Sequence, residues 1–141
     1  MNYFMKKWHN FINRQKDSDQ VAKIILFNGD KILLLLTALG PFKGQLDLPG
    51  GHLHYNEDPE RGLQREVREE TGLRISGFTK IYRDDRIHFY YGELPDQDIV
   101  LSHEHHGYSI LHLDEINKDE YEISDIFLRA IKEAYKLVQK E

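Results

Sequence analysis

The sequence of 141 residues contains no cysteine. A disulfide framework and a thiolate zinc site are therefore excluded, which is compatible with a reducing compartment. No apolar run approaches the roughly 20 residues that a membrane-spanning helix needs. The N-terminus also lacks the apolar core of a signal peptide. We therefore expect a cytoplasmic protein that has no membrane partner.

Basic residues are outnumbered, with 19 lysines and arginines against 24 acidic residues and a net charge of −5. Non-specific binding of DNA or RNA depends on a basic surface, so we expect no nucleic-acid partner. A small phosphorylated substrate is still compatible with this charge, because a bound divalent cation inverts the local field. The length fits one domain that is large enough to bury a core.

The apolar runs predict a sheet of short strands followed by a C-terminal helix. Asn28-Gly29 lies between two apolar runs and indicates a β-hairpin, since both residues tolerate positive φ. Leu33 to Leu36 is apolar without alternation, which predicts a strand buried on both faces. An apolar stripe at helical spacing predicts the last helix, with Ser124 as its N-cap. The predicted strands are Val21–Phe27, Ile32–Ala38, Arg74–Tyr82, Ile87–Gly92 and Gly107–Leu113.

The first residues carry an apolar stripe at helical spacing, which predicts an amphipathic helix over Met1–Lys16. Such a helix either packs on the domain or frays at the terminus. Two alternatives stay open, a contact within a homodimer and a surface-binding helix. Asp17-Ser18-Asp19 is interpreted as a break, which divides the chain into an extension over 1–18 and a domain over 19–141.

The stretch from Gly50 to Leu73 predicts a tight Gly-Gly turn, a loop and a helix. Asp58 is placed to cap the helix, and Pro59 falls at the first helical position, where its missing N–H costs nothing. Gly72 stands where a left-handed residue ends many helices. A strand–loop–helix frame of this kind is typical of sites that bind phosphate and metal.

Three glutamates of this helix, Glu66, Glu69 and Glu70, fall within about 100° of one another on its surface. Glu66 and Glu70 form a like-charge i,i+4 pair, so they need a cation nearby. An ordinary charged helix with exposed ion pairs is the plain alternative. An Arg65–Glu69 pair, however, would leave the other two glutamates without a cation. The crowding therefore favours a site for a hard cation such as Mg²⁺, which prefers carboxylate and carbonyl oxygens.

The same stretch resembles the signature of the Nudix hydrolases, G-x5-E-x7-R-E-U-x-E-E-x-G-U, where U is aliphatic. Asp47 departs from the pattern of many relatives, which have an aromatic residue just before the Leu-Pro-Gly-Gly sequence. The resemblance implies an α/β fold, the α/β/α sandwich with a mixed central sheet between helices. Every defined position matches, at Gly51, Glu57, Arg65, Glu66, Val67, Glu69, Glu70, Gly72 and Leu73.

The resemblance implies a nucleotide pyrophosphatase that cleaves a phosphoanhydride bond of a nucleoside diphosphate linked to a group X, with a nucleoside triphosphate favoured. It also implies a Mg²⁺ cofactor, or Mn²⁺ in its place. Glu69 is the first choice for orienting or deprotonating the attacking water. Glu57 is implied to pair with Arg65 and fix the loop. The implied metal ligands are Gly50, through its carbonyl, and Glu66, Glu69 and Glu70, with Arg65 among the catalytic residues.

Many relatives recruit an acidic residue from outside the signature, and Glu104 is the candidate here, as base or as extra ligand. An exposed loop carboxylate is the alternative. Glu104 is flanked by His103, His105 and His106, but their spacing is not that of a His-Glu-x-x-His zinc helix. A polar loop near a phosphate site is the preferred interpretation.

Two further residues are candidates for substrate binding. His52 follows the Gly-Gly turn and is placed to face phosphates, although a solvent-exposed strand residue fits as well. Tyr90 lies where some dinucleoside-polyphosphate hydrolases of this family carry a tyrosine, but strand aromatics are more often part of the core. The alternatives for the function are a dinucleoside-polyphosphate or nucleotide-sugar hydrolase and a non-catalytic nucleotide sensor.

Overall fold

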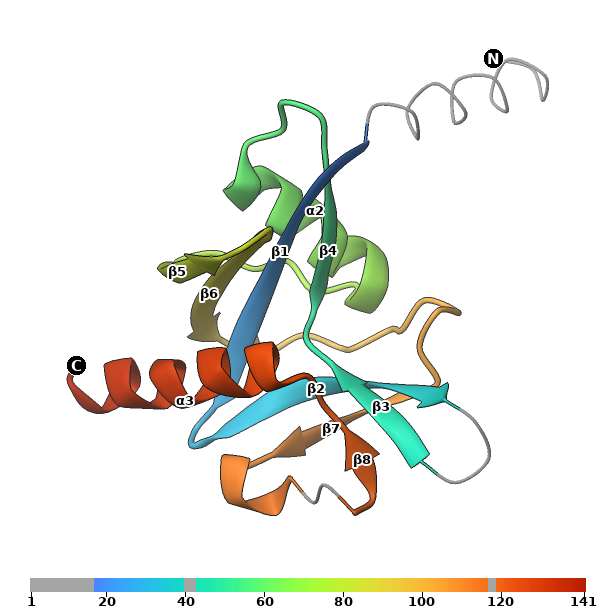
Figure 1. Ribbon diagram of the computed structural model, residues 1–141, viewed down its shortest axis with the longest axis vertical. Helices are drawn as coiled ribbons and strands as arrows, with labels where there is room; N and C mark the ends of the chain where they lie inside the picture. The colour runs from blue at the N-terminus through green and yellow to red at the C-terminus, as the bar shows by residue number, and fades with distance from the viewer. Residues whose placement is uncertain (1–16, 40–42, 117–118) are drawn as a thin grey trace.

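The computed structural model describes residues 17–39, 43–116 and 119–141 (Figure 1), so the helix predicted before residue 17 lies outside the described residues. These ranges hold eight strands, two α-helices and one short 3₁₀ helix. In chain order they are β1 (Asp17–Asn28), β2 (Lys31–Leu39), β3 (Lys43–Asp47), β4 (Gly50–His54), α2 (Pro59–Thr71), β5 (Thr79–Asp84), β6 (Ile87–Glu93), β7 (Gly107–Leu111), η1 (Leu113–Glu115), β8 (Tyr121–Glu122) and α3 (Asp125–Gln139).

The strands form one mixed sheet that divides into two halves at the β1–β2 hairpin. In one half β1 pairs with β4 antiparallel and with β6 parallel, and β5 extends that half from β6. In the other half β2 pairs antiparallel with β3 and β7, and β8 extends it from β3. The two halves meet where Phe27 pairs with Ile32 beside the turn, in which Gly29 has a φ of +65°. The hairpin predicted at Asn28-Gly29 is therefore confirmed.

Alternate residues of β1 supply two cores, one on each face of the sheet. Ala22, Ile24 and Leu26 pack with α2, whereas Ile25 and Phe27 pack with α3. Figure 1 accordingly shows α3 crossing in front of β1 and α2 behind it. The predicted α/β/α arrangement is confirmed, as is the burial of the β2 strand on both faces, where three successive leucines, Leu33, Leu34 and Leu35, are fully buried.

Several element boundaries differ from the predictions. Asp17-Ser18-Asp19 is part of β1 and is not a break, because Asp17 pairs with His54 and the Ser18 hydroxyl donates to the carbonyl of Leu53. Lys43-Gly44, expected in a loop, begins β3.

The strand expected from Arg74 begins only at Thr79. The Gln97 side chain accepts from the N–H of Arg74 at 2.8 Å and donates to its carbonyl at 3.2 Å, which replaces the bonds of a strand partner. The last predicted strand likewise ends at Leu111, before η1. The C-terminal helix begins as predicted, with Ser124 accepting from the N–H of Ile126.

Candidate active site

Helix α2 is fixed at both ends by the residues that predicted it. The Asp58 side chain accepts from the N–H of Arg61 at 3.2 Å, and Pro59 occupies the first turn. Gly72 adopts a left-handed conformation with φ of +75°, and its N–H donates to the carbonyl of Arg68. Between these ends the helix buries Leu63 and Val67 against the sheet. Glu66 and Glu70 therefore stand at the border between the core and solvent.

Gly50-Gly51, expected as a tight turn, instead begins β4 and lets that strand approach this acidic border closely. Gly50 has a φ of +125°, and a Cβ there would collide with the backbone of Ala22. A Cβ on Gly51 would lie only 2.5 Å from the carboxylate of Glu66. The N–H of Gly50 donates to Oε1 of Glu70 at 2.7 Å. The start of β4 and the helix therefore form one unit that carries a backbone carbonyl and two carboxylates.

A cavity of about 410 Å³ opens beside this unit. Glu69 is not among its lining residues, because its side chain points outward and is 58% exposed. The lining includes five residues named from the sequence as candidate site residues, Gly50, His52, Glu66, Glu70 and Glu104, and five others, Lys23, Thr37, Asp47, Gly51 and His105.

Arg65 connects the acidic groups around the mouth of the site. Its guanidinium binds both carboxylate oxygens of Glu57 at 3.0 Å, which confirms the contact predicted for that pair. It also reaches Oε1 of Glu66 at 2.9 Å and Oε2 of Glu69 at 3.3 Å. The expectation that an Arg65–Glu69 pair leaves Glu66 without a cation was wrong, because the same guanidinium binds Glu57, Glu66 and Glu69. The hydrogen bond from Arg65 lowers the pKa of Glu57, whereas burial raises the pKa of Glu66.

Lys23 lines the cavity and was not predicted as part of the site. It is only 8% exposed, and its ammonium donates to Oδ1 of Asp47 at 3.0 Å. It also donates to the carbonyls of Leu48 at 3.0 Å and Gly50 at 3.1 Å. The signal in the sequence was a single lysine inside the apolar run of β1, where a charged group requires a partner.

Glu70 is a buried carboxylate, with 7% of the residue exposed. Burial raises its pKa to about 7, against the opposing effects of the Lys23 charge and the hydrogen bond from Gly50. Its ligand atoms gather with those of Asp47 and His105 within 4.8 Å of one another. His105 is buried as well, and its Nε2 lies 3.4 Å from Oδ2 of Asp47. This cluster joins residues from three separate parts of the chain, which is why the sequence did not reveal it.

The segment before β7 is tied to the end of α2 by backbone hydrogen bonds. The N–H of Val100 donates to the carbonyl of Thr71, and the N–H of Ser102 donates to the carbonyl of Glu70, both at 2.8 Å. The N–H of His106 then reaches the carbonyl of Leu36 on β2 at 2.9 Å. Glu104 lies between these attachments, which explains why this exposed carboxylate reaches the cavity.

Of the two residues predicted to bind substrate, only His52 lines the cavity, with an exposed side chain. Tyr90 is 2% exposed and packs in the core on the α2 face, edge-to-face with Phe78 at 5.6 Å. Its place in the core corresponds to the alternative given for it above, and the arrangement offers no support for a contact with substrate.

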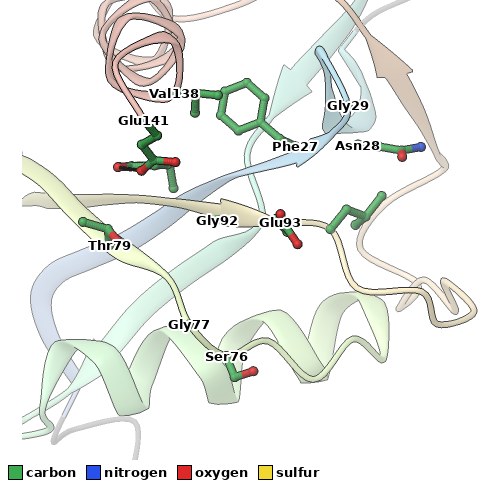
Figure 2. A pocket seen from close by; sticks show the side chains of 12 residues that line it. Phe27, Asn28, Gly29, Ser76, Gly77, Thr79, Gly92, Glu93, Val138 and Glu141 are labelled. Atoms are coloured by element: carbon green, nitrogen blue, oxygen red, sulfur yellow. Dashed lines mark hydrogen bonds between the residues drawn. The ribbon is translucent and has the colours of Figure 1, made fainter.

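A larger cavity, of about 620 Å³, lies elsewhere on the molecule. Figure 2 shows its lining around the β1–β2 turn, the segment that leads into β5, the end of β6 and the C-terminal end of the chain at Val138 and Glu141. Its two carboxylates belong to Glu93 and Glu141, and Glu141 is engaged by the hydroxyl of Tyr91 at 2.6 Å. The metal-ligand cluster found among the described residues borders the smaller cavity. We therefore take the smaller cavity as the candidate active site.

The donors around the smaller cavity fit a hard divalent cation. Carboxylate and carbonyl oxygens are the ligands that Mg²⁺ prefers. Glu66, Glu70 and the carbonyl of Gly50 offer such oxygens from one rigid unit. Burial raises the pKa of Glu70, and a cation bound beside it would favour the ionised carboxylate.

A comparison with protein families finds that the model described as NUDIX domain matches residues 18–131. The ADP-ribose pyrophosphatase of Methanocaldococcus jannaschii is 39% identical over 70 residues, which cover 45% of this chain and 41% of that protein. The MutT-like protein of Streptomyces ambofaciens is 36% identical over 69 residues, which cover 48% and 43% of the two chains. The chain thus spans less than half the length of these curated relatives.

Solved structures share the fold. The MutT protein from Methanosarcina mazei Go1 superposes with a TM-score of 0.65 at 24% identity, over 86% of this chain and 94% of that one. The Ap4A hydrolase of C. elegans, solved as a binary complex, gives a TM-score of 0.66 at 18% identity, over 86% and 98% of the two chains. At these identities the likeness extends to the fold alone.

Proposed function

We propose that this chain, which belongs to the Nudix family, is a metal-dependent hydrolase. It would cleave a phosphoanhydride bond of a nucleoside diphosphate linked to a further group. The observation that carries this proposal is the unit of Gly50, Glu66 and Glu70 on the wall of one open cavity. The motif residues were named from the sequence alone, and the three of them lie together in space.

The proposed ligands of the cation are Glu66, Glu70 and the carbonyl of Gly50, with Glu69 at the exposed side of the helix. A bound Mg²⁺, or Mn²⁺ in its place, would neutralise the phosphates and lower the pKa of the attacking water. The protein itself fixes the positions of the carboxylates. Arg65 holds Glu57, Glu66 and Glu69 in one hydrogen-bonded group beside the site.

Two carboxylates are candidates for taking the proton from the attacking water. The motif favours Glu69, which is exposed and paired with Arg65 at 3.3 Å. Glu104 is favoured because it lines the cavity. Backbone hydrogen bonds from its neighbours to α2 and β2 hold its segment in place. His52, which also lines the cavity, is proposed to contact the phosphates.

The substrate class follows from the chemistry of the family. ADP-ribose, the compound in the name of the first relative, is itself a nucleoside diphosphate linked to a further group. We propose a nucleoside triphosphate as the first substrate to test, followed by ADP-ribose, nucleotide sugars and dinucleoside polyphosphates.

No helix in the described part of the chain has both the length and the apolar character to span a membrane. A cytoplasmic location and a homodimer remain proposals from the sequence.

The test is a panel of these compounds incubated with the protein and MgCl₂ or MnCl₂, with release of phosphate or pyrophosphate measured after coupling to a phosphatase. We expect turnover of at least one compound, loss of turnover with EDTA, and loss in the Glu70→Gln variant. Turnover that is insensitive to EDTA would refute the metal-dependent reaction. Binding of a nucleotide without turnover of any compound would favour the nucleotide sensor instead.

A further inference from the structure

Among the described residues that line the candidate cavity, Lys23 carries the only lysine or arginine charge. Its ammonium has three donors. All three are used, by Oδ1 of Asp47 and by the carbonyls of Leu48 and Gly50, at 3.0 to 3.1 Å. The ammonium therefore has no donor left for a substrate phosphate, and its function must lie within the protein.

The groups near this ammonium would otherwise suit a divalent metal ion. Asp47, Glu70 and His105 bring their ligand atoms within 4.8 Å of one another, and all three line the cavity. Two carboxylates and an imidazole are a common donor set for divalent ions. The carbonyl of Gly50 adds a further oxygen on the same side. Lys23 thus supplies a positive charge where a metal ion would find ligands.

The charge of Lys23 is needed there in the absence of a metal. Asp47 uses one carboxylate oxygen for Lys23 and the N–H of Leu48, and the other faces Nε2 of His105. Buried carboxylates without a counter-ion are strongly destabilising. On its other side the ammonium lies 5.9 Å from the centre of the Phe127 ring of α3, which also tolerates a cation. Lys23 is therefore held as a fixed counter-ion by Asp47 and the carbonyls of Leu48 and Gly50.

We propose that the Lys23 ammonium is the resident cation of the Asp47–Glu70–His105 cluster, and that it keeps divalent ions off Asp47 and His105. A divalent ion is thereby confined to the side of the cavity that carries Glu66. Asp47 and Lys23 act as a matched pair in this role, because Asp47 holds the ammonium in place. The inference concerns ion binding and does not require the hydrolytic reaction proposed above.

The test compares Mn²⁺ binding by the wild type with that of Lys23→Met, Lys23→Arg and the double variant Lys23→Met/Asp47→Asn. Titration calorimetry gives the affinity, and electron paramagnetic resonance of free Mn²⁺ gives the number of bound ions. We expect Lys23→Met to bind Mn²⁺ at least about tenfold more tightly or to bind one additional ion, since a repulsive charge has gone and the carboxylate of Asp47 is freed. Lys23→Arg retains the charge and should behave like the wild type. The double variant should lose the gain, because Asp47 is neutral in it.

Unchanged or weaker Mn²⁺ binding by Lys23→Met would overturn the inference. Removal of a lysine that only packs against its neighbours or stabilises the start of β4 should give no gain in Mn²⁺ affinity. Should Lys23→Met fold only when MnCl₂ is present, while the double variant folds without it, the inference is supported, because a metal ion then replaces the ammonium. Failure of both variants to fold, with or without MnCl₂, would overturn it in favour of a packing role. Absence of Mn²⁺ binding by the wild type counts against the proposed function, whereas the contrast between the variants decides the role of Lys23.

Discussion

The side chain of Glu70 accepts a hydrogen bond of 2.7 Å from the backbone N–H of Gly50, and this bond joins α2 to the start of β4. The two residues are 20 positions apart in the sequence. The same glycine presents its carbonyl to Lys23 at 3.1 Å. The position of the proposed metal-binding carbonyl is thus set by groups on β1, β4 and α2. Both contacts require the backbone conformation of Gly50.

A first prediction concerns Gly50→Ala. The φ of +125° is outside the range that side chains favour, and the added Cβ would run into the backbone of Ala22. We expect a loss of roughly 3 kcal/mol or more in the free energy of unfolding, with loss of any Mn²⁺ binding. Gly77→Ala is the matched control, since Gly77 also has positive φ but faces open space. It should cost only about 1 kcal/mol. Equal losses in urea denaturation would contradict the argument.

A second prediction concerns the two glutamates that line the cavity. Glu66→Gln and Glu70→Gln each remove one anionic ligand and keep the shape of the side chain. We expect either change to weaken Mn²⁺ binding by at least about tenfold and to lower kcat/KM by about 100-fold or more. Glu60→Gln, on an exposed position in the first turn of the same helix, is the control and should change neither quantity. Calorimetry and steady-state kinetics provide the measurements.

A third prediction separates Glu69 from Glu104 as the group that takes the proton from water. The variant of the true base should lose kcat by about 100-fold or more while Mn²⁺ affinity is retained. The variant of the other residue should retain kcat within about tenfold of the wild type. The lining of the cavity leads us to expect the larger loss for Glu104→Gln. A larger loss for Glu69→Gln would support the assignment that the motif implies.

A fourth prediction concerns Arg65, whose guanidinium is shared by three carboxylates and the carbonyl of His52. Arg65→Lys keeps the charge but cannot bind Glu57 through two parallel hydrogen bonds. We expect a loss of roughly 1–3 kcal/mol in stability, measured by denaturation. Arg61→Lys, at an exposed position one turn earlier, should change stability by less than about 0.5 kcal/mol. A similar loss in both variants would show that Arg65 contributes only helix propensity.

The sequence predicts those parts of the fold that depend on neighbours along the chain. The ends of α2 follow from Asp58, Pro59 and Gly72, each of which acts within one helical turn. The β1–β2 turn follows from Asn28-Gly29 in the same way. The delayed start of β5 could not be predicted, because it depends on Gln97, which lies 23 residues from Arg74.

The same distinction holds for the candidate site. The motif identifies Glu66 and Glu70 because helical spacing alone brings them onto one face. It does not identify the contact of Lys23 with Asp47, which are 24 residues apart and on different halves of the sheet. Nor does it reveal that Arg65 contacts Glu66, since this depends on the conformation of a long side chain. Contacts across the sheet are what local patterns omit.

The last prediction is a pH dependence that arises from Glu70. Its pKa is raised from 4.5 to about 7 in the folded protein, chiefly by burial. Between these values the folded state holds a proton that the unfolded state has released. The stabilisation is therefore fully present below about pH 4.5 and is lost as the pH rises through about 7. The difference between the two pKa values corresponds to a change of about 3 kcal/mol in the free energy of unfolding.

Comparison with Glu70→Gln isolates this effect from the other carboxylates. Gln keeps an acceptor for the N–H of Gly50 but does not titrate. The free energy of unfolding of the metal-free wild type, measured relative to the variant, should therefore fall between pH 4.5 and 7 and level off above. Mn²⁺ must displace the same proton, so its affinity for the wild type should fall by up to about tenfold per pH unit below pH 7. A wild type whose stability runs parallel to that of Glu70→Gln over this range would show that Glu70 is already ionised, with Lys23 and Gly50 together compensating its burial.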